Sequence, residues 1–578
     1  MRNYNINKQS TYIAILSIIS IIVIFFTQGY SSASETRDYV RSRSVIDAAS
    51  PSDNAKKDIY GLVIGINEYD SPFPSLEGAV NDADDVADAL RKRKARRIWL
   101  LENKEATRDH IITAWHELAA TAKAGDIVII HVASHGARSP EKISGTGTRG
   151  LDEFVVLPTF KTEGVGTRER IINKEWGGLL RDVPQLEIVF VADTCHSGSM
   201  TRGFKPRKLK TRLLSKDAIQ IQNDAIPTPD PNKWVVAPEK LSHVVFFGAV
   251  GQDEEVPEIV IDGKTRGALS WAVANGLRGA ADLNKDSFVT KDELVTYVRE
   301  NVITQTEGEQ HPHITPGNIG LNLVVDSSSA IHYIPPSLSP LTLEILNTTK
   351  VSPSDLVKDL HNVILAKDGQ AADLTWDVSQ GKLRNQMQDT LIFPNAGSGE
   401  KPSAPAEEAT RDYRRVTSSE RDAKSDIPRI QSAIDKRSLA LWLAKLSESQ
   451  PLSIALNPKD TLQHKNDHAD LTISGNNYPF LTVVNIGPSG NINLIYPVQG
   501  DPLEIPKGKP YKLELTADEP FGSEHFVGIA SDKALTTFHK GLASIDGKLK
   551  MDEFKSLITD VARGVKFQMG IHTVFTSP

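Results

Sequence analysis

Short apolar runs alternate with helical patterns along the first half of the chain, and this alternation limits the possible folds more than any other feature. The runs 59–66 and 126–132 are rich in apolar residues throughout, which is typical of strands buried on both faces of a parallel sheet. The segments 81–91 and 107–123 have the pattern of helices of ten or more residues. We therefore predict an α/β domain over residues 58–323, with a mostly parallel sheet flanked by helices.

The second half of the chain has a different composition. Proline, glycine and charged residues dominate 324–472, which we predict to be a linker region with short helical elements. From 473 to 578, strand-like runs separated by glycine and proline turns predict a β-rich C-terminal domain, with a sandwich as one form it could take. A length of 578 residues agrees with several folded units.

The N-terminal residues have the order of a secretory signal peptide. Arg2 and Lys8 precede an apolar run at 12–26, and small residues follow at 31–33. This run is shorter than the ~20 residues that cross a bilayer, so we expect segment 1–33 to be cleaved rather than kept as an N-terminal anchor. The mature chain is then exported, to the periplasm or the cell exterior, and contacts a membrane only if the segment is uncleaved.

Charge and cysteine content narrow the classes of function. The chain has 66 basic and 73 acidic residues, a formal net charge of −7, so we predict no nucleic-acid partner. Its one cysteine excludes an intramolecular disulfide. A lone thiol in an oxidising compartment calls for a functional explanation, although free cysteines are also common as small buried apolar residues. The oligomeric state stays open.

Two predicted strands end in residues that can do chemistry. Ser-His-Gly at 134–136 follows one strand, and Asp-Thr-Cys-His-Ser-Gly at 193–198 follows another. Ligands bind at the carboxyl ends of strands in open α/β sheets, so His135 and Cys195 could face each other there. An imidazole can activate a thiol and later protonate a leaving amine. We predict Cys195 as nucleophile and His135 as general base; the alternative is two core residues at strand ends.

Together, these motifs resemble those of the caspase-like cysteine peptidases of the metacaspase and orthocaspase branch, over about residues 60–319. The resemblance implies a caspase-like α/β fold and endopeptidase activity. It also implies an oxyanion hole formed by the N–H groups of Gly136 and Cys195, a role for which neighbouring glycines are suited. One departure precedes the histidine: 132–134 reads Val-Ala-Ser where the family usually has Tyr-Ser-Gly, which removes a hydroxyl from the expected substrate pocket.

The same resemblance implies that Asp82 and Asp193 line a pocket for an arginine or lysine side chain. Two carboxylates suit a guanidinium because charge-assisted hydrogen bonds fix its position and direction. For Asp82 an alternative stays open, since it also lies in an acidic run that suits a helix start. The expected partners are therefore protein or peptide substrates with basic residues, and no cofactor is required.

One acidic segment has the spacing of a calcium-binding loop. Asp282, Asn284, Asp286 and Glu293 occupy loop positions 1, 3, 5 and 12 of an EF-hand. Position 6 is Ser287, where the sharp turn favours glycine. Members of the resembling family often have a similar Asp-rich sequence that forms a structural turn. We therefore favour a structural turn and keep calcium binding as the alternative.

The segment 202–216 is crowded with basic residues and has weak strand and helix signals. An exposed basic loop just after the nucleophile is held near a site that selects basic residues, so we predict self-cleavage within it. A solvated loop, or one that binds an acidic partner, is the alternative. For the whole chain, the alternatives are a catalytically idle scaffold and a cell-envelope protein acting through its C-terminal domain, which resembles a domain appended to bacterial caspase-like proteins.

Overall fold

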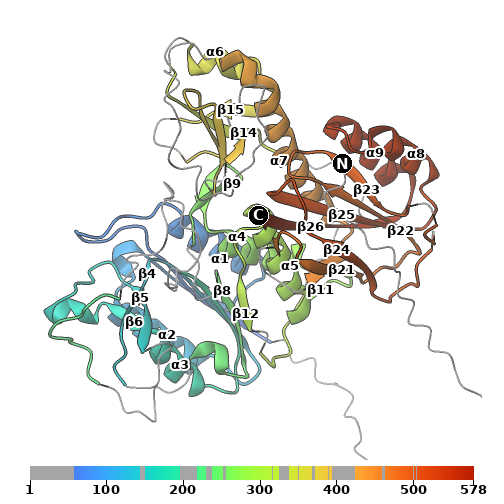
Figure 1. The fold of residues 1–578 in the computed structure, drawn as a ribbon. Helices are drawn as coiled ribbons and strands as arrows, with labels where there is room; N and C mark the ends of the chain where they lie inside the picture. Colours follow the sequence, from blue (N-terminus) through green and yellow to red (C-terminus); the bar gives the residue numbers. More distant parts are fainter. Residues whose placement is uncertain are drawn as a thin grey trace, which may run out of the picture. The chain divides into compact units, whose positions relative to one another are not determined.

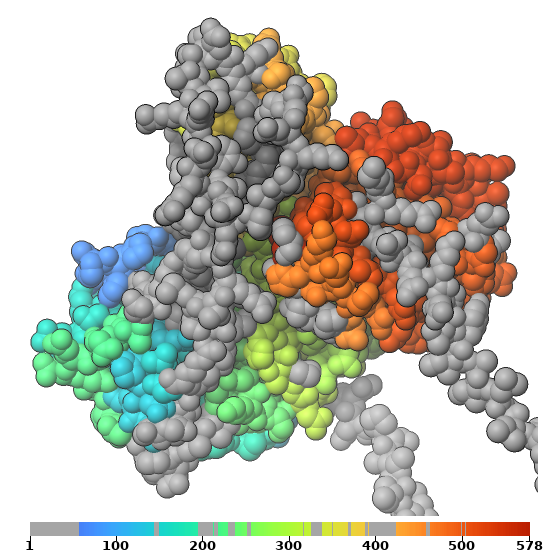
Figure 2. Space-filling view, in the orientation of Figure 1, coloured from blue at the N-terminus to red at the C-terminus, as the bar shows by residue number. Residues whose placement is uncertain are grey.

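The computed structural model describes most of the chain beyond residue 56, and Figures 1 and 2 colour these residues while the others are grey. The predicted signal segment 1–33, Cys195 and most of the basic loop 202–216 lie outside the described residues. Within the described part, no helix is both long and apolar enough to cross a membrane. The described residues are 57–143, 150–194, 212, 218–228, 237–250, 256–315, 317–324, 338–348, 351–367, 371–387, 390–392, 423–457, 463–498, 500–502 and 504–577.

A six-stranded sheet forms the centre of the α/β domain. Its strands are β1 (Ile59–Gly65), β2 (Arg97–Glu102), β3 (Ile127–Ala133), β7 (Glu187–Asp193), β8 (Val244–Gly248) and β12 (His313–Thr315). The strand order is β12-β8-β7-β3-β1-β2, and all neighbours pair in parallel except the edge strand β12. The predicted α/β fold with a mostly parallel sheet is confirmed.

Helices cover both faces of this sheet (Figure 1). They are α1 (Ala79–Lys92), α2 (Arg108–Thr121), α3 (Asn173–Arg181), α4 (Ala268–Asn275) and α5 (Lys291–Gln305). Ile129 of β3 belongs to one core with residues of α1, α4 and α5, whereas the next residue, Ile130, belongs to a second core with residues of α2 and α3. Successive strand residues point to opposite faces, so a sheet covered on both sides requires strands that are apolar throughout.

Shorter elements complete the α/β domain. β4 begins directly after His135 and forms a three-stranded antiparallel sheet with β5 and β6. β9 and β10 form a hairpin that leads into α4, and β11 pairs with β13. These elements are β4 (Gly136–Pro140), β5 (Leu151–Val156), β6 (Arg170–Ile172), β9 (Ile259–Ile261), β10 (Lys264–Arg266), β11 (Phe288–Thr290), β13 (Asn322–Val324), and the short helices Asn103–Glu105, Gly164–Arg168, Pro238–Lys240 and Gly276–Ala280.

The described residues of 324–472 form more regular structure than the predicted linker with short helical elements. Its described residues include a five-stranded sheet in the order β15-β14-β16-β17-β18 and a helix of 21 residues, α7. Leu343, Trp376 and Ile434 are fully buried in a core of their own. The elements are β14 (Leu341–Leu346), α6 (Pro353–Val357), β15 (Val363–Leu365), β16 (Leu374–Asp377), β17 (Lys382–Asn385), β18 (Thr390–Ile392), the short helix Ala423–Asp426 and α7 (Ile427–Ser447).

The predicted β-rich C-terminal region is confirmed, with differences at its boundary and in its helices. It comprises β19 (Ser453–Asn457), β20 (Gln463–His464), β21 (His468–Ser474), β22 (Phe480–Ile486), β23 (Ile492–Tyr496), β24 (Tyr511–Thr516), β25 (Ser523–Ser531), α8 (Thr536–Ile545), α9 (Met551–Gly564) and β26 (Phe567–Ser577). Strand β19 pairs with β21, so the strands begin before residue 473. Residues of α7, α8 and α9 share a core with the five-stranded sheet β20-β26-β25-β22-β23, and β19-β21-β24 form a second sheet.

Candidate active site

Two neighbouring strand ends bring the predicted motifs to one edge of the central sheet. Ala133 at the end of β3 is the register partner of Asp193 at the end of β7. His135 therefore lies two residues after the end of β3, at the same edge of the sheet as Asp193, the last residue of β7. Cys195 lies outside the described residues, so its distance from His135 and its oxyanion role stay predictions.

His135 is buried and held in one orientation. Its side chain Nε2 lies 2.9 Å from the carbonyl oxygen of Pro74, and its ring packs at 4.8 Å, centroid to centroid, from that of Tyr69. A carbonyl oxygen can only accept, so Nε2 carries the hydrogen of the neutral ring and Nδ1 carries the lone pair. Nδ1 has no hydrogen-bond partner among the described residues. This is the arrangement that a general base requires.

The electrostatic setting of His135 favours the neutral imidazole. Burial lowers the pKa of His135, the backbone carbonyl groups of Pro74 and Arg212 oppose this by raising it, and the positive charge of Arg212 adds a smaller lowering. A neutral ring can accept a proton at Nδ1, whereas an imidazolium cannot. The site therefore keeps His135 ready to act as a base near neutral pH.

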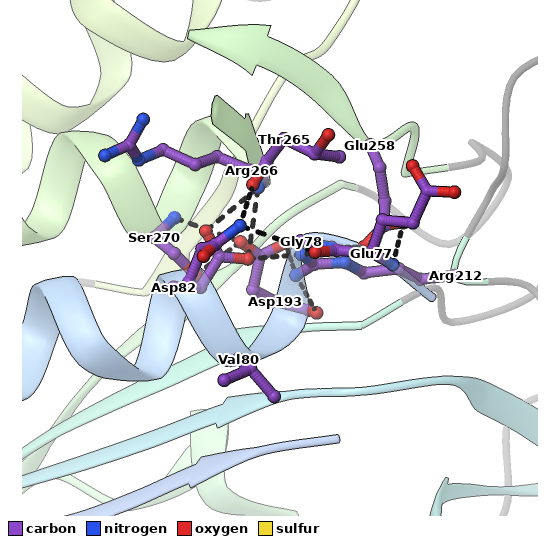
Figure 3. A network of polar contacts seen from close by, with 12 residues as sticks. Glu77, Gly78, Val80, Asp82, Asp193, Arg212, Glu258, Thr265, Arg266 and Ser270 are labelled. Carbon is purple, nitrogen blue, oxygen red and sulfur yellow. Dashed lines mark hydrogen bonds and ion pairs between the residues drawn. The ribbon is translucent and has the colours of Figure 1, made fainter. Parts of the chain in front are cut away.

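Arg212, from the predicted basic loop, fills a pocket of acidic side chains in this structure (Figure 3). Its side chain is fully buried, and its guanidinium forms ion pairs with Asp82, with Asp193 and with Glu258. Nη1 lies 2.9 Å from Asp193 Oδ1 and donates to the Asp193 carbonyl at 2.8 Å, while Nη2 donates to Asp82. Asp82 and Asp193, predicted to line a pocket for a basic side chain, thus bind one together.

The backbone of Arg212 is held as well as its side chain. Its carbonyl oxygen accepts from the N–H of Gly136 at 2.8 Å, and its own N–H donates to the carbonyl of Val256 at 3.0 Å. Gly136 is the predicted oxyanion donor. The carbonyl group of Arg212 is thereby held at Gly136, the residue after His135, while its side chain lies among the carboxylates.

The three carboxylates give this pocket a strong preference for a cation. Burial raises the pKa of Asp82 to about 8; the charge of Arg212 opposes the rise and that of Asp193 adds to it. Burial alone would lower the pKa of Arg212, but the charges of Asp193, Asp82 and Glu258 outweigh it and raise the pKa. Arg212 therefore stays charged, and its charge offsets the cost of burying several carboxylates together.

Backbone N–H groups hold each carboxylate in place. Gly267 N–H contacts both oxygens of Asp82, at 3.0 and 3.1 Å, and Ser270 N–H donates to Asp193 Oδ2 at 3.0 Å. These donors lie at the start of α4, where the helix dipole favours negative charge. The side chain of Asp82 therefore points into the pocket, and no side-chain cap is formed at the α1 start. Asp82 also lies in the first turn of α1, so its place at the helix start and its place in the pocket occur together.

Glu258 is a pocket residue that the sequence analysis missed. Its two oxygens accept from the N–H groups of Glu77 and Gly78, both at 2.8 Å, at the start of α1. Its Oε1 also lies 3.6 Å from Arg212 Nη2. No periodicity or motif marks this glutamate in the sequence.

The segment with EF-hand spacing forms a turn that hydrogen bonds to its own acidic side chains stabilise. Asp282 accepts from the N–H groups of Asp286 and Ser287, both at 3.1 Å. Glu293 accepts from Thr290 in a reciprocal cap at the start of α5. Ser287 takes the left-handed conformation, with φ 73°, that a glycine would adopt at lower cost. In the described residues, no three acidic, histidine or cysteine side chains gather as a metal site, and calcium binding by Asp282, Asn284, Asp286 and Glu293 stays a prediction.

Comparison with known proteins gives a match to a domain family and to curated relatives. Residues 60–320 match the family model described as a caspase domain. "Metacaspase-1B" of Aspergillus terreus is 25% identical over 260 residues, covering 38% of this chain and 66% of that protein. "Metacaspase-7" of Arabidopsis thaliana is 30% identical over 148 residues, covering 24% of this chain and 34% of that protein. The match thus spans less than two thirds of either relative.

A solved structure described as "structure of pro-sf-caspase-1" aligns with 46% of this chain and 90% of its own, at 13% identity and a TM-score of 0.30, which is too low to support a conclusion. The family model and the metacaspase similarity cover the segment that holds the central sheet, His135 and the acidic pocket. Residues 60–320 of this chain thus match the caspase-domain family model and are similar in sequence to metacaspases.

Proposed function

We propose that this chain is a cysteine endopeptidase that cleaves peptide bonds after arginine or lysine, with Cys195 as nucleophile and His135 as base. A caspase domain with metacaspase relatives supports cysteine-type endopeptidase activity. The observation that carries the proposed specificity is Arg212, whose side chain pairs with Asp82 and Asp193 while its carbonyl oxygen accepts from Gly136 N–H. A substrate arginine would occupy the same place.

The geometry supports a defined sequence of steps. The Cys195 thiol gives its proton to His135 Nδ1, and the sulfur attacks the carbonyl carbon of the bound residue. The electron pair of the C=O bond moves onto oxygen, where the N–H of Gly136 stabilises the negative charge. The C–N bond then breaks as His135 returns the proton to the leaving amine, and water hydrolyses the thioester.

The pocket explains the preference for basic residues. An aspartate side chain in it would add a further negative charge to Asp82, Asp193 and Glu258 without a counterion, at a high cost in free energy. Arginine is expected to bind better than lysine because its separate nitrogens meet Asp82 and Asp193 at once. The proposed substrates are therefore proteins or peptides with accessible basic residues.

The same contacts support self-cleavage in the loop 202–216, and they favour one bond. Among the basic residues of this loop, the structure describes Arg212, with its side chain in the pocket and its carbonyl on the predicted oxyanion donor. The proposed cut is the bond between Arg212 and Leu213. Export of the mature chain remains part of the proposal on the strength of the N-terminal sequence.

A substrate profile of wild-type protein and an Asp193→Asn variant tests the specificity. In a peptide library varied at the residue before the cut, wild type should accept arginine and lysine and reject aspartate. Asp193→Asn should lower kcat/KM for arginine substrates about 100-fold, because removal of one partner of a buried charge pair typically costs 2–5 kcal/mol.

Asp126→Asn is the matched control for this profile. Asp126 is also buried, but it accepts backbone N–H groups of Asp58 and Lys123 just before β3, at the opposite edge of the sheet. It should leave the profile unchanged. A wild-type preference for aspartate would contradict the pocket assignment, and absence of cleavage in a folded wild-type protein would favour the scaffold alternative.

A further inference from the structure

A buried histidine outside the proposed catalytic steps lies behind the acidic pocket. His131, in the middle of β3, is fully buried, and its Nε2 lies 2.8 Å from Ser270 Oγ at the start of α4. The Ser270 hydroxyl also donates to Asp193 Oδ2. Three side chains from two strands and a helix thus form a series of hydrogen bonds that ends on the carboxylate of Asp193. Figure 3 shows Asp193 and Ser270.

The direction of these hydrogen bonds follows from the acceptor at their end, the carboxylate of Asp193. An ionised carboxylate only accepts, so the single hydroxyl hydrogen of Ser270 is directed to Asp193. Ser270 Oγ can then only accept from His131, which places the ring hydrogen on Nε2. His131 Nδ1 has no hydrogen-bond partner among the described residues, in agreement with a lone pair there. Burial also lowers the pKa of His131 to about 4, so the ring is neutral at working pH.

This chain fixes which oxygen of Asp193 faces the substrate. Oδ2 accepts two donors from Ser270, its N–H and its hydroxyl, and Oδ1 is left to face Arg212 Nη1 at 2.9 Å. The packing is tight on the other side as well: a Cβ added at Gly267 would lie 2.1 Å from Oδ2. The Asp193 carboxylate therefore cannot rotate freely in the pocket.

We propose that His131 and Ser270 are positioning residues that orient Asp193 and thereby set the preference for arginine over lysine. The inference rests on the proposed function, because it concerns the same pocket. The Arg212 guanidinium donates from Nη2 to Asp82 and places Nη1 2.9 Å from Asp193 Oδ1, an ion pair without a hydrogen bond, so its two nitrogens meet two carboxylates whose placement must fit both. A lysine ammonium is a compact charge that tolerates a rotated carboxylate better.

Steady-state kinetics on matched arginine and lysine peptides tests this inference. Ser270→Ala removes the hydroxyl donor and keeps the N–H, so we expect KM for the arginine peptide to rise about tenfold, as for loss of a hydrogen bond to a charged group. KM for the lysine peptide should change about threefold or less. The kcat for either peptide should change about twofold or less, because side-chain binding is common to the ground and transition states.

The variants of His131 separate positioning from packing. His131→Leu keeps much of the volume but lacks the donor, and it should shift the arginine-to-lysine ratio in the same direction as Ser270→Ala. His131→Gln keeps an N–H near the place of Nε2 and should restore the ratio. Val128→Ala, on the opposite face of β3, removes buried volume without changing the His131–Ser270–Asp193 hydrogen bonds. It should leave the ratio at the wild-type value. KM and the ratio do not depend on the folded fraction, so partial unfolding cannot imitate the effect.

The outcomes distinguish this inference from the proposed function. If wild type cleaves both peptides and neither Ser270→Ala nor His131→Leu changes KM or the ratio, the positioning role is wrong while the pocket stands. A ratio that Val128→Ala shifts as much as His131→Leu also overturns it. A wild-type protein that cleaves neither peptide contradicts the proposed function itself.

Discussion

Wild-type protein is expected to cut itself after Arg212, leaving Leu213 as a new N-terminus. The reason is that Arg212 already occupies the acidic pocket and its carbonyl accepts from Gly136 N–H, so we expect its carbonyl carbon to be presented to Cys195 at high effective concentration. Intact-mass and N-terminal analysis of the purified chain measures the cut directly. The Cys195→Ala protein should stay whole.

Two variants test whether Arg212 itself selects the bond. Arg212→Gln removes the side chain that pairs with the pocket and should abolish the cut at this bond. Arg207→Gln, in the same basic loop, is the matched control and should leave the cut after Arg212 in place. The assignment is wrong if the wild-type chain stays uncut at this bond while it hydrolyses arginine peptides, or if Arg212→Gln is still cut there at the wild-type rate.

Loss of either member of the proposed dyad should abolish peptide cleavage. We expect kcat/KM for an arginine peptide to fall by about 1,000-fold or more in Cys195→Ala and in His135→Ala, because removal of a nucleophile or its base from a catalytic unit typically has an effect of this size. The double variant should be little worse than either single variant. Thermal unfolding should show that Cys195→Ala remains folded.

His196→Ala is the control for this pair of variants. His196 is the neighbour of the nucleophile in the sequence, and we interpret it as having no part in proton transfer. It should keep most of the activity. If Cys195→Ala retains the wild-type rate, or if His196→Ala loses as much as His135→Ala, the assignment of nucleophile and base is wrong.

The α/β domain was predictable because its burial leaves a direct mark on the sequence. A strand such as β3, covered by helices on both faces, must be apolar at nearly every position, and this pattern is visible without a structure. The edge element β4 reads Gly-Ala-Arg-Ser-Pro and carries no such mark. It is held by antiparallel pairing with the next strand, β5, and not by burial of an apolar run, so its own residues did not predict it.

The region 324–472 shows the limit of compositional arguments. Strands β15 to β18 have three or four residues each, too short for a clear alternation to stand out among proline, glycine and charged residues. Their core depends on partners such as Trp376 and Ile434, which lie far apart in the chain. A low density of apolar residues therefore suggested a linker where the described residues form a small sheet.

The site was predictable to the extent that motifs lie at strand ends or, for Asp82, in the first turn of a helix. His135, Gly136, Asp82 and Asp193 meet in one place, as the resemblance implied. Glu258, Ser270 and His131 could not be found this way, because no motif marks them and their contacts join residues far apart in the sequence. His131 and Ser270 are 139 positions apart, and Ser270 and Asp193 are 77 positions apart. The choice of Arg212 from several basic neighbours likewise depends on tertiary contacts.

The most direct test of the proposed peptidase is active-site labelling. Wild-type protein would be incubated with a peptidyl-arginine chloromethylketone and, separately, with the aspartyl analogue, and the modified residue would be located by peptide mass mapping. We predict a single adduct on Cys195 with the arginyl reagent, prevented by His135→Ala, and none with the aspartyl reagent. Labelling of Cys195 by the aspartyl reagent alone, or no labelling by either reagent in folded protein, would contradict a peptidase that selects basic residues through Asp82 and Asp193.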